Sequence, residues 1–100
     1  METKVTLIAT INILPGFEKE VKESAITMAA ASNKEAGCEI FAAYTQKDSP
    51  QTIVIYEIYK SDEAFQSHKT SPHATAFFAL LKGKMVNDKI EVDFLTGLNS

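Results

Sequence analysis

The chain has 100 residues, of which 45% are hydrophobic and 23% are charged, and its net charge is -3. These values are typical of a globular protein, so we expect residues 1–100 to form a single domain with one core. The charges are interspersed, and no basic block is present that could neutralise a row of phosphates, which argues against a nucleic-acid partner. A single cysteine, the lack of a signal-peptide core and the lack of an apolar run of about 18 residues predict a cytoplasmic protein that does not enter a membrane.

The first third of the chain predicts a strand followed by a helix. Residues 4–13 alternate between two faces with the period of two that a strand requires, and Pro15 and Gly16 end this segment. From Phe17 to about Ala31, apolar residues recur at helical spacing among Lys and Glu. We therefore expect an amphipathic helix that packs on a sheet.

Two strands are predicted in the middle of the chain. Residues 38–46 follow a turn at 33–37, and their aromatic and β-branched side chains suit a pleated surface. Residues 52–60 follow a second turn at 47–51 and form the clearest strand, because nearly all of them are β-branched or aromatic. Both faces of this strand are apolar, so we expect it to lie centrally in the sheet, with Glu57 as an acid in apolar surroundings.

The last third predicts two helices and a final strand. Ser61 is a suitable cap for a short helix, and Ser71 with Pro72 is suitable for the start of another that runs to about Met85. Residues 89–95 alternate apolar and acidic side chains and form the last strand.

The resulting order, βαββαβ, is the split βαβ arrangement and predicts a ferredoxin-like α+β fold, with helices on one face of an antiparallel sheet. No helix is left to cover the other face, which would carry Thr6, Ile8, Thr10, Val54, Tyr56 and Ile58. Two such faces packed together would bury apolar surface that a small monomer exposes. We therefore expect a homodimer that forms a dimeric α+β barrel.

Glu57 and His68 are the strongest candidates for chemistry. An unpaired carboxylate within a two-sided strand is costly, so Glu57 needs a partner, and His68 is the natural one. Two interpretations stay open. The pair is either a structural contact between helix and sheet, or a histidine oriented by a carboxylate to move protons on a bound substrate.

We expect no metal and no nucleotide or flavin cofactor. The sequence lacks phosphate-binding glycine loops, CxxC and HExxH. His68 and His73 are separated by five positions with Pro72 between them, which does not place both imidazoles on one helix face.

Several aromatic side chains belong either to the core or to the walls of a flat pocket for an aromatic ligand. They are Phe41, Tyr44, Tyr56, Tyr59, Phe65, Phe77 and Phe78.

The stretch VIYEIYKSDEAFQSHKTSPH resembles the signature of the antibiotic biosynthesis monooxygenase superfamily. The LPG after the first strand, the stretch EAGCEIF and the closing strand agree with it, so the resemblance covers nearly the whole chain. Within the signature, the positions that recur in the family are matched by Glu57, Phe65, His68 and His73. The superfamily includes quinol oxygenases, haem-degrading enzymes and an isomerase that acts in autoinducer-2 phosphate breakdown.

The resemblance implies a cofactor-independent monooxygenase that acts on a small aromatic quinol or phenol in an apolar cavity. His68 would be the proton acceptor and Glu57 would orient it, while the substrate would contact Tyr44, Tyr59, Phe65, His73 and Phe77. Haem is disfavoured, because haem-degrading members carry Asn, Trp and His at the positions of Ala9, His68 and Phe78.

Two alternatives remain. One is the isomerase branch, which keeps a Tyr at position 59 and a similar HKTSPH stretch, and whose phosphorylated substrate would need cations from Lys60, Lys69 and Lys82. The other is a dimer that binds a small ligand without turnover. The lining of the cavity separates the three hypotheses. An apolar lining with one histidine favours the oxygenase, two or more lysines at the mouth favour the isomerase, and a filled core without a cavity favours a protein that is no enzyme.

Overall fold

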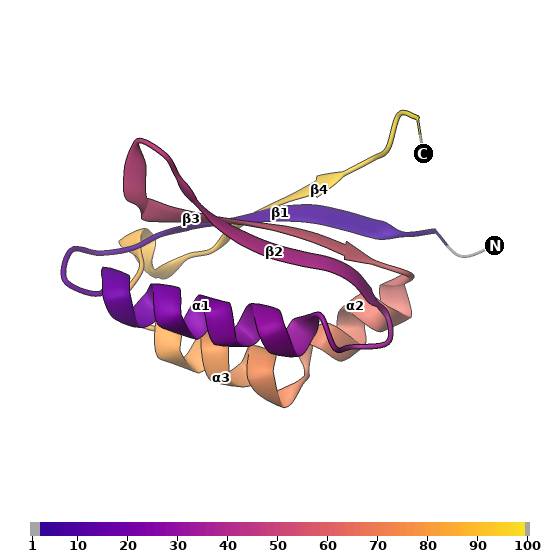
Figure 1. The fold of residues 1–100 in the computed structure, drawn as a ribbon, viewed down its shortest axis with the longest axis horizontal. Coiled ribbons are helices and arrows are strands. Elements are labelled where there is room, and N and C mark those ends of the chain that lie inside the picture. Colours follow the sequence, from indigo (N-terminus) through magenta and orange to yellow (C-terminus); the bar gives the residue numbers. More distant parts are fainter. Residues whose placement is uncertain (1–2, 100) are drawn as a thin grey trace.

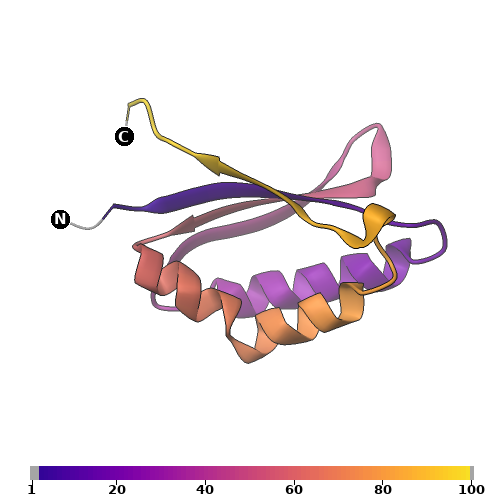
Figure 2. The same cartoon turned by 180° about the vertical axis from the view of Figure 1, so that it is seen from behind.

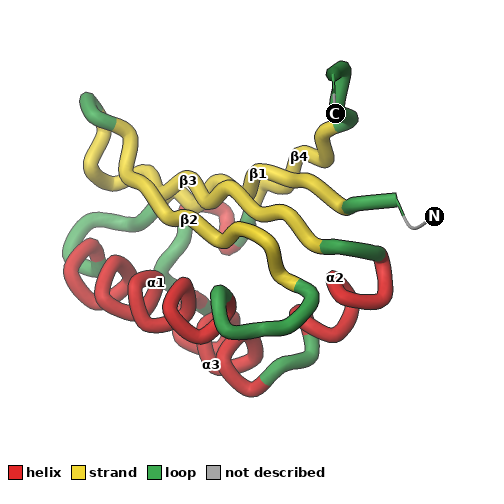
Figure 3. The backbone as a smooth tube through the Cα atoms, turned by 45° about the vertical axis from the view of Figure 1, so that its right-hand side comes forward, coloured by secondary structure: helices red, strands yellow, loops and turns green. Residues whose placement is uncertain are grey.

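Four strands form one antiparallel sheet in the order β2-β3-β1-β4 in the computed structural model, which describes residues 3–99. The strands are β1 (Val5–Asn12), β2 (Cys38–Gln46), β3 (Ser49–Tyr59) and β4 (Glu91–Leu95). The helices are α1 (Glu18–Ser32), α2 (Asp62–Lys69) and α3 (Pro72–Leu81). Figures 1 and 2 show from opposite sides that the helices lie against one face of the sheet. Figure 3 shows the helix layer in red and the sheet in yellow. The predicted ferredoxin-like α+β fold is confirmed.

Burial alternates along the central strands as the pleat requires. From Ile53 onward, the buried side chains of β3 point toward the helices, and they are Ile53, Ile55, Glu57 and Tyr59. The residues between them are partly exposed on the opposite face, which we call the open face, and they are Val54, Tyr56 and Ile58. Pairing of Leu7 with Glu57 places the buried side chains of β1 beside those of β3. The predictions that β3 is central and that Glu57 faces the helices are confirmed.

Two serines fix the path of the chain from the sheet into the helices. The hydroxyl of Ser61 accepts a hydrogen bond from the backbone N–H of Ala64, and that of Ser71 accepts one from Ala74, both at 3.2 Å. Both predicted caps are therefore present. Because α3 begins only a few residues after α2 ends, the last turn of α2 and the first turn of α3 lie close together.

The start of β3 differs from the sequence prediction. The strand begins at Ser49, because Gln46 pairs with Ser49 and only Lys47 and Asp48 remain for the turn. Pro50 lies within the strand, although proline has no N–H to donate. It is tolerated because the pairing of β1 with β3 ends at Thr52, so Pro50 lies beyond the neighbouring strand.

The end of the last helix also differs, since α3 ends at Leu81 rather than near Met85. Gly83 has a φ of 77°, which turns the chain away from the helix axis. Met85 then pairs with Ile13 in an isolated β-bridge, so its backbone is bound to the sheet side of the molecule. The last strand is correspondingly shorter than predicted and begins at Glu91.

Strand β4 is one of the two edge strands of the sheet. It pairs with β1, and all of its residues are exposed, including Val92 at 46% and Phe94 at 64%. Such exposure of apolar side chains is unusual for a strand that remains uncovered.

The helices of residues 3–99 include none that combines the length and the apolar character needed to cross a bilayer.

Candidate functional site

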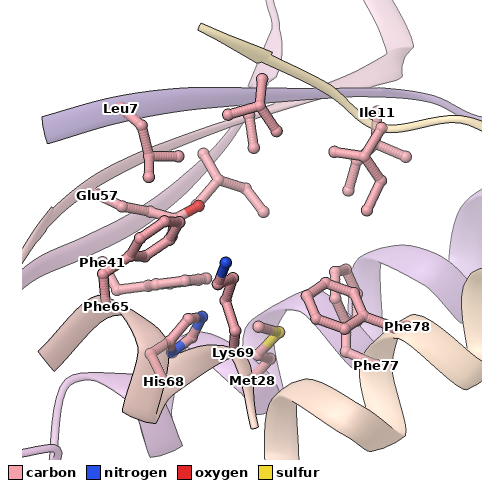
Figure 4. Close-up of a pocket in the computed structure, with 14 residues that line it drawn as sticks. Leu7, Ile11, Met28, Phe41, Glu57, Phe65, His68, Lys69, Phe77 and Phe78 are labelled. Atoms are coloured by element: carbon pink, nitrogen blue, oxygen red, sulfur yellow. The ribbon is translucent and has the colours of Figure 1, made fainter. Parts of the chain in front are cut away.

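A cavity of about 160 Å³ lies between the sheet and the helices (Figure 4). Its size is close to that of apolar cavities of about 150 Å³ that bind benzene, so it suits one aromatic ring. Three of its lining residues carry charge or can do so, namely Glu57, His68 and Lys69. The other lining residues are apolar: Leu7, Ala9, Ile11, Met28, Phe41, Ile55, Phe65, Phe77, Phe78, Ile90 and Val92.

Glu57 enters the cavity from β3, and its side chain is held by a neighbour on the same strand. The hydroxyl of Tyr59 donates a hydrogen bond of 2.6 Å to Oε1 of Glu57. Burial raises the pKa of Glu57 to about 7, an effect that the bond from Tyr59 opposes and the charge of Glu35 increases. Near neutral pH the carboxyl group therefore exists in both protonation states, so it can give or take a proton.

His68 enters the cavity from the helix side, on the last turn of α2, whereas Glu57 enters it from the sheet (Figure 4). Its ring lies 5.0 Å from that of Tyr59 and 5.5 Å from that of Phe41, measured between centroids. Its Nδ1 is hydrogen-bonded to Oε2 of Glu35 at 2.8 Å. The ring nitrogen left for a ligand in the cavity is therefore Nε2.

Glu35 and His73 continue the hydrogen-bonded chain away from the cavity. Glu35 lies in the turn between α1 and β2, and its Oε2 also bonds Nε2 of His73, at 2.5 Å. The exposed fraction of the side chains rises along this chain, from 3% for His68 through 17% for Glu35 to 23% for His73. The chain thus leads from the buried cavity toward the surface.

Two imidazoles and a carboxylate are also the donor set of many zinc and non-haem iron sites. The donor atoms of Glu35, His68 and His73 all lie within 4.8 Å of one another. Both nitrogens, however, are at hydrogen-bond distance from the same oxygen, so the carboxylate oxygen holds the central position that a metal would take. We interpret the cluster as a hydrogen-bonded network. As the sequence predicts, the two imidazoles do not share one helix face, since His68 lies on α2 and His73 on α3. The two successive helices nevertheless bring them together, with ring centroids 5.9 Å apart.

The predicted pairing of Glu57 with His68 is corrected. Both residues line the same cavity, but the recorded partner of Glu57 is Tyr59 and that of His68 is Glu35. Glu35 was missed because it lies 33 residues from His68 in a turn, where no periodicity marks a functional side chain.

The other predicted site residues separate into two groups. Phe65 and Phe77 line the cavity. Tyr59 is fully buried and bonded to Glu57, and His73 is bonded to Glu35, and neither residue is part of the lining.

Tyr44 lies away from the cavity. It pairs with Val54, whose side chain is on the open face, whereas its neighbour Ala43 pairs with the buried Ile55. One position along a strand reverses the direction of the side chain, so Tyr44 points away from the helices. Its side chain is 60% exposed.

Of the three lysines considered as phosphate ligands, Lys69 alone lines the cavity. Its Nζ lies 4.7 Å from the centroid of the Phe65 ring. Lys60 and Lys82 are exposed and lie outside the lining.

This chain is similar to a family model, to solved structures and, over part of its length, to one further bacterial protein. The family model described as antibiotic biosynthesis monooxygenase matches residues 4–80. PA3566 from Pseudomonas aeruginosa has a TM-score of 0.90 and 26% identity, with 98% of this chain and 97% of that chain covered. Rv0793 from Mycobacterium tuberculosis also has a TM-score of 0.90, at 23% identity, with 98% of each chain covered. YjcS from Bacillus subtilis (strain 168) is 40% identical over 42 residues, which are 42% of this chain and only 40% of YjcS.

Proposed function

The chain belongs to the antibiotic biosynthesis monooxygenase family, and from this premise we propose that it is a cofactor-independent monooxygenase that acts on a small phenol or quinol. The observation that carries the proposal is the cavity of about 160 Å³, which is apolar except for Glu57, His68 and Lys69. An apolar cavity with one histidine suits an aromatic ring whose hydroxyl must lose a proton. The small volume favours a substrate with a single ring.

His68 is the base in this proposal. Its Nε2 takes the hydroxyl proton of the substrate, and the resulting phenolate is rich enough in electrons to reduce dioxygen directly. One oxygen atom bonds to the ring carbon opposite the hydroxyl group and becomes the second carbonyl oxygen of a quinone. The other oxygen atom leaves as water, with the hydroxyl hydrogen and the hydrogen of that ring carbon. Phenol and dioxygen thus give quinone and water, and the substrate supplies all the electrons.

Glu57 is the proposed proton donor to the departing oxygen atom. It lines the cavity from the sheet, whereas His68 lines it from α2, so a ring bound in the cavity can contact both groups (Figure 4). A carboxyl group with a pKa of about 7 is matched to proton transfer near neutral pH. This role replaces the predicted one, in which Glu57 orients His68.

The test is oxygen consumption with single-ring substrates. Phenol should be oxidised to benzoquinone, followed by its absorbance, and the two-ring 1-naphthol, whose opposite ring carbon also carries a hydrogen, should react more slowly because it exceeds the cavity. His68→Ala should lower kcat by about a hundredfold or more, the usual contribution of a general base. Ser67→Ala, at an exposed neighbour on the same helix, is the control. Equal rates for His68→Ala and the unchanged protein would refute the proposal.

The isomerase alternative receives less support. Its phosphorylated substrate requires several cations near the cavity, whereas among Lys60, Lys69 and Lys82 the lining includes Lys69 alone. Binding without turnover is distinguished by the oxygen assay.

We also propose that the protein is a homodimer formed through the open face of the sheet. Support comes from the partly exposed Ile8, Tyr56 and Ile58, which lie on the face opposite to the helices. Apolar strands of this kind usually pack against a second layer.

A further inference from the structure

Glu35 and His73 lie outside the cavity lining, yet they are bonded to the proposed base. Nδ1 of His68 and Nε2 of His73 share Oε2 of Glu35 as their partner. An ionised carboxylate only accepts hydrogen bonds, so Nδ1 of His68 must carry a proton in this arrangement. Because a neutral imidazole has one N–H, Nε2 of His68 is left with a free lone pair.

We propose that Glu35 and His73 are positioning residues for His68: Glu35 fixes the tautomer in which Nε2 can accept a proton, and His73 holds the carboxylate of Glu35 in place. This inference rests on the proposed role of His68 as the base. It assigns to a residue of the turn before β2 the role that the sequence had suggested for Glu57.

Glu35 also balances the charge that the reaction creates. When the O–H bond of the substrate breaks and an N–H bond forms at Nε2, His68 becomes a cation and the substrate a phenolate. His68 is only 2% exposed, and an isolated charge at such a position is strongly disfavoured. The carboxylate 2.8 Å from Nδ1 offsets this charge, and Nδ1–H continues to donate to it.

His73 is needed because the side chain of Glu35 has few other contacts. The backbone of the turn is fixed by its own hydrogen bonds, from Glu35 N–H to Ser32 and from Cys38 N–H to Glu35. The hydrogen bonds that the structure records for the Glu35 carboxylate, by contrast, come from the two imidazoles. Glutamate side chains are flexible, so without the contact to His73 the carboxylate of Glu35 would sample other rotamers.

The direct test is the tautomer of His68, measured on the free protein by long-range proton–nitrogen NMR at neutral pH. The unchanged protein should show Nδ1–H and a bare Nε2. Glu35→Gln should lose this preference, because an amide can present a donor or an acceptor to Nδ1. His73→Ala should change it in the same direction but less, since Glu35 keeps its bond to His68. Glu39→Gln is the matched control, because Glu39 is bonded to Lys4 rather than to a histidine.

The kinetic test uses the phenol that the protein oxidises fastest. Glu35→Gln should lower kcat by about a hundredfold, the lower range of what a general base contributes, with little change in KM because Glu35 lies outside the cavity lining. An Nε2–H tautomer in the unchanged protein, or an unchanged tautomer or kcat in Glu35→Gln, would overturn the inference. Failure of the proposed function is distinguishable, because it would appear as absent oxygen consumption in the unchanged protein while the NMR result still decides the tautomer.

Discussion

Gly37 lies directly against Ala64: a Cβ atom on Gly37 would stand 2.4 Å from the Cβ of Ala64. This distance is far below ordinary carbon contact, so the close approach requires a residue without a side chain. Gly37 belongs to the turn that carries Glu35, and Ala64 belongs to the helix that carries His68. The contact therefore sets the distance between the two elements that the Glu35–His68 hydrogen bond joins.

Gly37→Ala should push the turn away from α2 and weaken the bond between Glu35 and His68. We expect a loss of about 1–3 kcal/mol in the free energy of unfolding, as for other overpacked contacts. Adding Ala64→Gly removes the clashing Cβ and should restore the contact, at a cost of about 1 kcal/mol for a glycine within a helix. Urea unfolding and the NMR tautomer of His68 measure both effects. A Gly37→Ala variant that keeps both the stability and the tautomer would contradict the prediction.

Glu57 should make the protein less stable as the pH rises. Burial raises its pKa to about 7 in the folded protein, compared with about 4.3 in an unfolded chain. Between these values the folded state binds more protons than the unfolded state, so the free energy of unfolding falls with increasing pH.

Glu57→Gln keeps an oxygen to accept the hydrogen bond from Tyr59 and should remove this dependence. Above about pH 8 the free energy of unfolding of the variant should exceed that of the unchanged protein by up to about 4 kcal/mol, since one unit of pKa corresponds to about 1.36 kcal/mol. At about pH 4 the advantage should disappear. Urea unfolding across this range provides the measurement, with Glu63→Gln at an exposed position of α2 as the control. Parallel pH profiles for Glu57→Gln and the unchanged protein would rule the prediction out.

Ala9→Leu should fill the cavity and prevent a single ring from binding. Ala9 lines the cavity and pairs with Ile55 on β3. Ala43 pairs with the same Ile55 from the other side but lies outside the lining, so Ala43→Leu is a matched control. Binding of phenol, measured by calorimetry without oxygen to prevent turnover, should be lost in the first variant and kept in the second. Unaltered binding to Ala9→Leu would show that the ring binds elsewhere.

Ile58→Asp should convert the proposed dimer into a monomer, because it places a charge in the apolar open face. Ile26→Asp changes a residue of α1 that is 68% exposed and should leave the dimer intact. Light scattering at micromolar concentration gives the mass of each variant. The interface of a stable dimer should bury at least about 1,200 Å² of surface in total. A monomeric unchanged protein would disprove the proposed assembly.

The parts of the fold that follow local rules were predictable from the sequence. Alternation along β3 indicated that Glu57 points toward the helices, since a period of two leaves only one choice once the buried face is known. Ser61 and Ser71 marked the helix starts because a cap satisfies backbone groups within three residues.

The parts of the site that depend on packing between distant segments were not predictable. Glu35 reaches His68 only because Gly37 lets the turn approach α2, and neither residue belongs to a periodic pattern. The direction of Tyr44 depends on the register of β2 against β3, which the sequence does not specify.

The alternation along β3 also bears on how such a protein can diversify. Ile55 and Glu57 line the cavity, while the residues next to them, Tyr56 and Ile58, belong to the open face. Point substitutions can therefore change the ligand preference and the self-association of the protein independently, although the affected positions are adjacent in the gene. An insertion or deletion of one residue instead changes both properties at once, because it moves every later side chain of the strand to the other face. It would place a carboxylate in the open face and an isoleucine in the cavity. Relatives with different substrates should accordingly differ in this strand by replacements and keep its length.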